Sequence, residues 1–286
     1  MDSFGQRLHA AVADRGPLCV GIDPHRSLLQ SWGLGDDVAG LAEFTRTVVS
    51  ALADRVAVLK PQVAFFERFG SRGVAVLEEA IGRARAAGAL VLLDAKRGDI
   101  GSTVAGYADA YLDPASPLSV DAVTAHPYLG VGSLAPLLDA ARAYGGGVFV
   151  LARTSNPEAG VVQRARTAGG RSVAQHVVDE ISQLNEGAGG LGSFGVVVGA
   201  TVRADELDLS RLGGPVLLPG LGTQGATAAD LPALVGSVPV TVLPSYSREV
   251  LRAGPDQAAL RAAADRARAA CEAALSPLAP GRRLPV

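Results

Sequence analysis

The sequence predicts an α/β protein built as a single (β/α)8 TIM barrel. Eight short apolar runs alternate with segments of helical periodicity over about 250 residues, which is the size and order of such a barrel. Hydrophobic residues make up 48% of the chain and aromatic residues only 5%. The core must therefore consist of Val, Leu, Ala and Ile, as in parallel strands covered by helices. An open, doubly wound sheet is the alternative architecture.

The apolar runs have the length and the Val and Leu content of buried strands. We expect strands over residues 17–22, 56–60, 90–94, 121–125, 147–152, 194–199, 215–218 and 238–243. Between the strands, apolar side chains recur every three or four residues, as on one face of a helix. We expect helices over 37–54, 73–87, 133–143, 172–186, 226–235 and 256–274, and another that begins near Gly101 and carries Tyr107 and Tyr111 on one face.

The remaining segments are expected to be connections. Residues 154–171, rich in Gly and Arg, form either a mobile surface loop or an insertion, and 187–193 is a flexible connection. The barrel domain is expected to occupy residues 1–275. Residues 276–286 are rich in proline and are expected to form a poorly ordered tail.

Composition argues against several classes of protein. A net charge of −2 argues against a nucleic-acid-binding surface and a basic membrane patch. No apolar segment approaches the ~18 residues needed to span a bilayer. Cys19 and Cys271 suggest no disulfide framework and residues 1–15 show no secretory signal, so we expect a cytoplasmic protein. The four histidines show no ligand spacing, and no metal site is expected.

Only two of the 26 basic residues are lysines, Lys60 and Lys96, and each stands at the end of an apolar run. Lysine is compact and able to release its proton, whereas arginine is in effect always charged. Asp94 and Lys96 are two residues apart, so on an extended segment their side chains share a face. Lys60, on the neighbouring strand, can reach the same space. The sequence therefore predicts two ammonium groups around a carboxylate.

Such a network is expected to hold both lysines charged and fixed in place. Opposite charges ~4 Å apart attract by roughly 4 kcal/mol at an effective dielectric near 20. A fixed ammonium suits a general acid, or stabilisation of a developing carbanion. A purely structural ion-pair network in the barrel mouth is the alternative.

Polar residues follow the predicted strands one after another, where the active sites of such barrels lie. They are Asp23 and His25, Lys60 and Gln62, Asp94 to Asp99, Thr124 and His126, Arg153 to Asn156, Pro219 and Gly220, and Ser245 to Arg248. A ring of acids, bases and hydroxyls predicts a pocket rather than a series of solvated turns. His126 is expected to be a packed residue. Ser155 lacks a G-x-S-x-G context and is expected to bond a ligand rather than act as a nucleophile.

Residues 220–225, Gly-Leu-Gly-Thr-Gln-Gly, match the dinucleotide-binding pattern G-x-G-x-x-G. The segment follows the seventh strand rather than the first, and no acidic residue stands about twenty residues later. A phosphate-binding loop of a barrel, completed by Ser247 and Arg248 after the eighth strand, fits better. A plain glycine-rich loop is the alternative.

Together these residues resemble the orotidine 5′-phosphate decarboxylase family. The segment from Asp94 to Ile100, Asp-Ala-Lys-Arg-Gly-Asp-Ile, is similar to the family signature, with Thr103 shortly after it. The resemblance covers nearly the whole chain. It extends to Gly21-Ile22-Asp23, Lys60, Thr154-Ser155-Asn156-Pro157, Pro219, Gln224 and Ser247-Arg248. Ser247 stands where many members have glycine, and the longer loops suggest the longer, bacterial subgroup.

The resemblance implies conversion of orotidine 5′-monophosphate to UMP and CO2, the last step of de novo pyrimidine synthesis, without a cofactor. It implies that Lys96 protonates C6 of the pyrimidine, that Asp94 lies beside the departing carboxylate, and that Lys60 and Asp99 complete the charge network. It further implies a homodimer in which Asp99 and Thr103 reach the partner's site. The other implied substrate contacts are the ribose to Asp23 and Lys60, the pyrimidine to Ser155, and the phosphate to Pro219, Gln224, Ser247 and Arg248.

Two other functions remain open from the sequence. One is a metal-dependent phosphosugar decarboxylase or aldolase on the same barrel, which shares the Asp-x-Lys-x-x-Asp pattern. The other is a barrel that binds a nucleotide without turning it over. The position of Lys60 and the Gln224 loop favour the nucleotide decarboxylase.

Overall fold

The computed structural model describes residues 2–222, 225–235 and 241–276, and these form a closed barrel of eight parallel strands. Each strand pairs with the next, and β1 pairs with β8, so the open sheet is excluded. The strands are β1 (Cys19–Ile22), β2 (Val58–Pro61), β3 (Leu90–Arg97), β4 (Ala122–Ala125), β5 (Gly147–Arg153), β6 (Phe194–Val198), β7 (Val216–Pro219) and β8 (Val242–Tyr246). The predicted fold class is confirmed.

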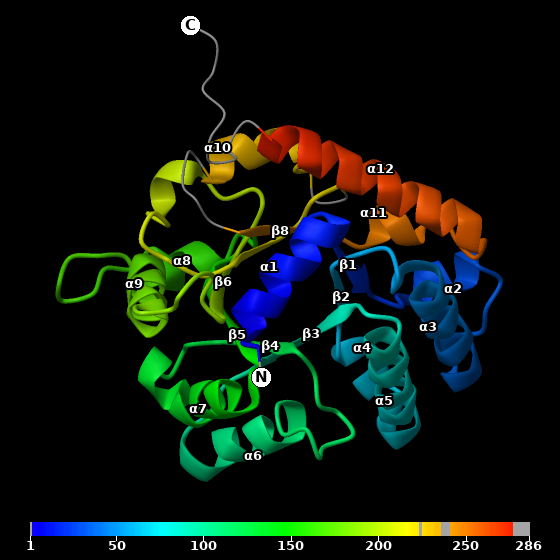
Figure 1. Cartoon of the computed structure of the whole chain (residues 1–286), viewed down its shortest axis with the longest axis horizontal. Coiled ribbons are helices and arrows are strands. Elements are labelled where there is room, and N and C mark those ends of the chain that lie inside the picture. Colours follow the sequence, from blue (N-terminus) through cyan, green and yellow to red (C-terminus); the bar gives the residue numbers. More distant parts are fainter. Residues whose placement is uncertain (1, 223–224, 236–240, 277–286) are drawn as a thin grey trace, which may run out of the picture.

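The helices surround the strands (Figure 1). They are α1 (Phe4–Arg15), α2 (Arg26–Ser31), α3 (Val38–Leu52), α4 (Ala64–Glu67), α5 (Gly70–Ala86), α6 (Gly101–Tyr111), α7 (Ala135–Tyr144), α8 (Ala159–Gln163), α9 (Val173–Asn185), α10 (Leu231–Val235), α11 (Arg248–Leu251) and α12 (Gln257–Leu275). Short 3-10 segments lie at Val131–Leu134, Ala204–Glu206 and Ala228–Asp230. On α6, the rings of Tyr107 and Tyr111 stack with centroids 6.3 Å apart, as their spacing predicts.

Several elements differ from the sequence prediction, among them the short helices α2, α4 and α11, which were not predicted. The eighth strand runs over Val242–Tyr246 rather than 238–243, whose residues up to 240 lie outside the described part of the chain. Pro244 lacks a backbone N–H and so cannot donate to a strand ladder. The structure continues past it, and Ser245 pairs with Cys19 of β1. The 154–171 segment contains the short helix α8, and the predicted tail lies almost wholly outside the described residues.

The longest helix that the sequence analysis did not predict is α1. It begins with a capping box, in which the Ser3 side chain accepts from the Gln6 amide and the Gln6 side chain accepts from the Ser3 amide. Figure 1 shows α1 (blue) lying over the barrel strands. Phe4 and Leu8 are buried in a cluster with the first residues of several strands. We conclude that α1 closes the amino-terminal end of the barrel and leaves the carboxyl end for a site.

Two apolar clusters hold this arrangement together. The larger lies between the strands and the surrounding helices, and the smaller fills the barrel interior. In the smaller cluster the Phe4 and Phe149 rings meet edge to face, with centroids 5.9 Å apart. Gly147 permits this contact, because a Cβ there would lie 2.3 Å from the Phe4 ring.

We predict that Phe4→Ala lowers the free energy of unfolding by about 3–4 kcal/mol, since it leaves a cavity among side chains that cannot collapse into it. Urea unfolding measures this change. Val161→Ala is the matched control, because Val161 is 83% exposed and should change stability by less than about 0.5 kcal/mol. Equal stability of the Phe4→Ala variant and the native chain would show that α1 does not brace the barrel.

Candidate active site

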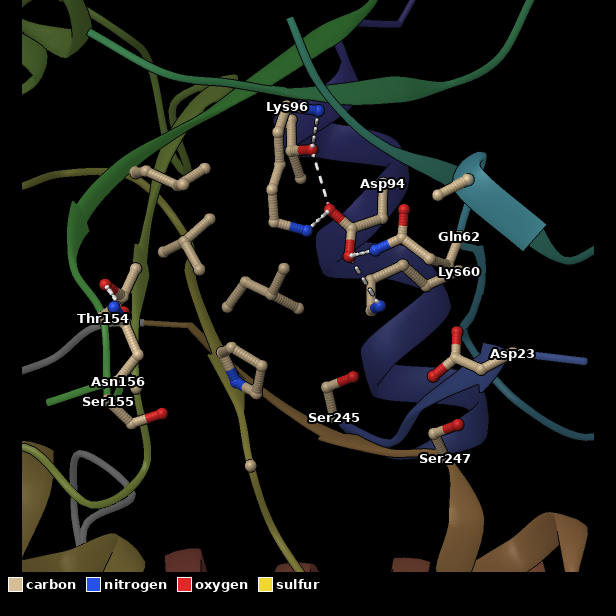
Figure 2. Close-up of a pocket in the computed structure, with 18 of the residues that line it drawn as sticks. Asp23, Lys60, Gln62, Asp94, Lys96, Thr154, Ser155, Asn156, Ser245 and Ser247 are labelled. Carbon is tan, nitrogen blue, oxygen red and sulfur yellow. Dashed lines mark hydrogen bonds and ion pairs between the residues drawn. The ribbon is translucent and has the colours of Figure 1, made fainter. Parts of the chain in front are cut away.

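A pocket of about 800 Å³ opens at the carboxyl end of the barrel. Residues from all eight strands, or from the loops that follow them, line it (Figure 2). Eight of the residues predicted from the sequence are among them, namely Asp23, Lys60, Asp94, Lys96, Ser155, Pro219, Ser247 and Arg248. The predicted ring of polar strand ends therefore surrounds one cavity.

Asp94 lies between the two lysines at the base of this pocket (Figure 2). Lys60 Nζ is 3.2 Å from Asp94 Oδ2, and Lys96 Nζ is 2.5 Å from Asp94 Oδ1. The Lys60 side chain is 7% exposed and the Asp94 side chain 11%, whereas the Lys96 side chain is 44% exposed. One ammonium is thus buried with the carboxylate, and the other points into the open pocket.

The charges of this network set one another's protonation. Burial acts to raise the pKa of Asp94, but attraction to Lys60 and Lys96, with hydrogen bonds from Lys96 and Thr124, outweighs it and lowers the pKa to about 2. Burial likewise acts to lower the pKa of Lys60, but Asp94 and then Asp23 hold it above its usual value. Asp94 and Lys60 are therefore both ionised near neutral pH.

The backbone at Lys96 is not the regular extended strand assumed from the sequence. Lys96 has a φ of 47°, the left-handed region, and the β3–β4 register shifts between Leu93 and Arg97. A left-handed conformation costs a residue other than glycine on the order of 1–2 kcal/mol. The two-residue spacing thus correctly predicted that Asp94 and Lys96 are paired. The Lys96 side chain, however, departs from an irregular part of β3 rather than from a regular strand.

Two further residues complete the network, and the sequence analysis did not select them as site residues. Gln62 Nε2 donates to Asp94 Oδ2 over 2.9 Å, and the Thr124 hydroxyl donates to Asp94 Oδ1 over 3.0 Å. The signal was available, because Gln62 directly follows β2 and Thr124 lies near the end of β4, and these two strands flank β3. The sequence did not show which of the polar residues near the strand ends would hydrogen-bond Asp94.

Two further polar groups of the pocket, on the same side as Lys60 in Figure 2, have no protein partner among the described residues. Asp23 Oδ1 and Ser247 Oγ are buried and have no hydrogen-bond partner among the described residues. Gly21 makes room for Ser247, since a Cβ at position 21 would lie 2.9 Å from Ser247 Cβ. Arg248 forms no ion pair within the described ranges. Buried polar groups normally have partners, so Asp23 Oδ1 can accept, and Ser247 Oγ can donate or accept, a hydrogen bond with a polar ligand.

The long 154–171 segment is held in place beside the pocket. The buried Arg153 donates to Glu206 over 2.8 Å, and Arg164 donates to both oxygens of the same carboxylate. Gln163 Oε1 accepts from the Thr154 amide over 2.8 Å. These contacts fix the strand-five residues, including Ser155, against the pocket wall.

Some predicted residues are not part of this pocket. Asp99, Thr103 and His126 do not appear in its lining within the described residues. His126 packs against the β3–α6 loop, since a Cβ built at Gly98 would lie 2.5 Å from His126 Cε1. Gln224 lies outside the described residues.

Residues 2–222, 225–235 and 241–276 contain no group of three or more His, Cys, Asp or Glu side chains arranged to hold a metal ion. None of their helices is long and apolar enough to cross a membrane.

Comparison with known proteins decides the family. Residues 16–263 match the model of the orotidine 5′-phosphate decarboxylase / HUMPS family. The chain belongs to this family. It is 71% identical to the orotidine 5′-phosphate decarboxylase of Salinispora arenicola over 96% of this chain and 99% of that protein. It is 61% identical to the orotidine 5′-phosphate decarboxylase of Streptomyces coelicolor over 93% of this chain and 96% of that protein.

Solved structures agree with this membership. A crystal structure from Streptomyces avermitilis superposes with a TM-score of 0.94 at 58% identity, covering 96% of this chain and 97% of that one. The Leishmania donovani OMP decarboxylase superposes with a TM-score of 0.74 at 33% identity, covering 95% and 98%. The family resemblance inferred from the sequence is confirmed.

We predict that the stabilisation from ionised Asp94 disappears in acid. The pKa of Asp94 is lower in the folded chain, about 2, than its usual value of 3.8. The contribution, roughly 2 kcal/mol, is complete above pH ~4 and is lost as the pH falls toward 2. Urea unfolding of the native chain and Asp94→Asn should give a stability difference that narrows as the pH falls from 6 to about 3.

A difference that stays constant over this range would contradict the assignment of the ionised carboxylate to Asp94. Asp109→Asn is the control for loss of a carboxylate from the exposed surface.

Proposed function

We propose that the chain decarboxylates orotidine 5′-monophosphate to UMP and CO2, the last step of de novo pyrimidine synthesis. Family membership supports the reaction. The observation that carries its mechanism is the Lys60–Asp94–Lys96 network at the base of the pocket. Loss of CO2 leaves an electron pair on C6 of a ring with no attached electron sink. A fixed ammonium stabilises such charge where it develops.

Lys96 is the proposed acid. As the C6–carboxylate bond breaks, the electron pair remains on C6 and takes a proton from Lys96 Nζ, which leaves a C6–H bond and a neutral amine. The Lys96 side chain is 44% exposed, so water can return the proton afterwards. Asp94 lies 2.5 Å from Lys96 Nζ and orients it. In this mechanism Asp94 stands beside the departing carboxylate.

The rest of the substrate is assigned to the other polar residues of the pocket and to Lys60. Asp23 and Lys60 are proposed to bind the ribose hydroxyls, and Ser155 the pyrimidine. The unpartnered, buried Asp23 Oδ1 can accept from a hydroxyl, which supports this role. Phosphate is assigned to Pro219, Gln224, Ser247 and Arg248. Support comes from the unpartnered Ser247 Oγ and the unpaired charge of Arg248 among the described residues. Contacts remote from the reacting carbon can then contribute binding energy to catalysis.

A homodimer is proposed to complete the site, with Asp99 and Thr103 reaching the partner's pocket and Asp99 extending its charge network. Thr103 is exposed in the single chain, and Asp99 lies outside its own pocket. Exposed apolar side chains stand on the same loop and on the adjacent one, with Ile100 62% and Tyr128 77% exposed. Apolar surface of this kind suits burial against a second copy. We also propose a cytoplasmic location, consistent with two free, buried cysteines.

The experiment that tests the function follows the absorbance of orotidine 5′-monophosphate with purified protein, with and without EDTA. The proposed function requires loss of the substrate chromophore at equal rates in both samples. Loss only without EDTA favours a metal-dependent enzyme of the same family. No loss in either sample, with UMP still bound, would leave a nucleotide-binding barrel without this activity.

We predict that Lys96→Ala abolishes turnover while the Kd for UMP stays within about tenfold. Lys96→Arg is the sharper variant, because it keeps the positive charge but cannot release a proton at accessible pH. Both variants should lack turnover in the absorbance assay, and calorimetry should show that both bind UMP. Substantial activity in Lys96→Arg would remove Lys96 as the acid.

We predict that Arg248→Ala weakens UMP binding by about 2–3 kcal/mol, roughly 30- to 150-fold, as expected for loss of a charge-assisted contact. Binding of uridine, which has no phosphate, should be unaffected. Arg252→Ala, one helical turn further and exposed, is the matched control and should bind UMP normally. Equal losses for UMP and uridine would place the phosphate elsewhere.

A further inference from the structure

The conformation of Lys96 needs an explanation that the charge network does not supply. Among residues 2–222, 225–235 and 241–276, Lys96 is the only non-glycine residue with positive φ. Such strain persists only where the surrounding structure holds it, and it is concentrated at functional sites. The question is which contact holds the backbone at this position.

Thr124 makes that contact. It lies in β4, next to β3, and is 1% exposed. Its Oγ1 accepts a hydrogen bond from the backbone amide of Lys96 over 2.9 Å. The same hydroxyl lies 3.0 Å from Asp94 Oδ1. Because an amide can only donate, the single hydroxyl proton is directed to the carboxylate.

One hydroxyl therefore fixes two parts of the site at once. It holds the left-handed backbone from which the Lys96 side chain departs. It also holds Asp94 Oδ1, the oxygen that lies 2.5 Å from Lys96 Nζ. Thr124 thus positions the backbone of Lys96 directly and the Lys96 ammonium through Asp94.

The neighbouring contacts do not duplicate this role. The Arg97 carbonyl accepts from the His126 amide over 2.9 Å, and the Asp94 carbonyl accepts from the Val63 amide over 3.3 Å. Gln62 holds the other carboxylate oxygen, Asp94 Oδ2. These bonds fix the chain on either side of Lys96 and the far oxygen of Asp94. Among the described residues, Thr124 alone bonds both the Lys96 amide and Asp94 Oδ1.

We infer that Thr124 is a positioning residue for the decarboxylation and acts through Lys96 and Asp94. The inference rests on the proposed function, in which the Lys96 ammonium must stand at C6. A displacement of about 1 Å at a reacting group can cost on the order of a hundredfold in rate. Loss of the hydroxyl should therefore slow the chemical step and leave substrate binding nearly unchanged.

The test compares kcat and KM of Thr124→Val and Thr124→Ser with the native chain. Valine keeps the shape and removes the hydroxyl, and kcat should fall by about a hundredfold while KM changes less than about threefold. Serine keeps the hydroxyl and should recover kcat to within a few fold. Thr124→Ala removes the hydroxyl without placing a methyl group against Asp94, and replaces the valine variant if that variant does not fold.

Thr45→Val is the matched control. Thr45 is 2% exposed in α3, and its hydroxyl has no partner among the described residues. The same exchange there should leave kcat and KM unchanged. An unchanged kcat in Thr124→Val, a change in KM alone, or a serine variant as slow as the valine variant overturns the inference. Absence of turnover in the native chain is a separate result, which removes the proposed function itself.

Discussion

The carboxylate of Asp94, held between Lys60 and Lys96, is the interaction on which the rest of the site depends. Taking charges out of water is costly unless they are paired with good geometry and hydrogen-bonded. Here the carboxylate accepts hydrogen bonds from two ammonium groups, one side-chain amide and one hydroxyl. The apolar barrel makes these attractions stronger than they would be in water. It also holds the groups in place, so little reorganisation is needed when charge develops on a substrate.

The two lysines reach Asp94 from strand ends of different geometry. Lys60 reaches Asp94 from the regular, buried end of β2. Lys96 reaches it through the bulge at the end of β3, at the cost of a strained backbone. Both ammonium groups line the pocket, but the Lys60 side chain is nearly buried and the Lys96 side chain is 44% exposed. The greater exposure of Lys96 suits its proposed role, because its proton must be replaced from water after each turnover.

Much of this could be predicted from the sequence, because strand ends in a barrel converge on one mouth. The apolar runs before Lys60 and Asp94 were enough to place them together. The left-handed Lys96 and the doubly bonded Thr124 were not predictable, because both depend on the register between β3 and β4. Helix α1 was also missed in the sequence analysis. Only a few of its residues are buried, and they pack against the first residues of the strands. The roles of Asp99 and Thr103 come only from the family resemblance, and neither residue lines the pocket of the described chain.

The most direct test of this account is a crystal structure of the chain with UMP bound. The account predicts the pyrimidine C6 within contact distance of Lys96 Nζ, the ribose hydroxyls on Asp23 and Lys60, and the phosphate on Arg248. UMP bound with C6 turned away from Lys96, or with its phosphate at the Lys60 end of the pocket, would contradict it.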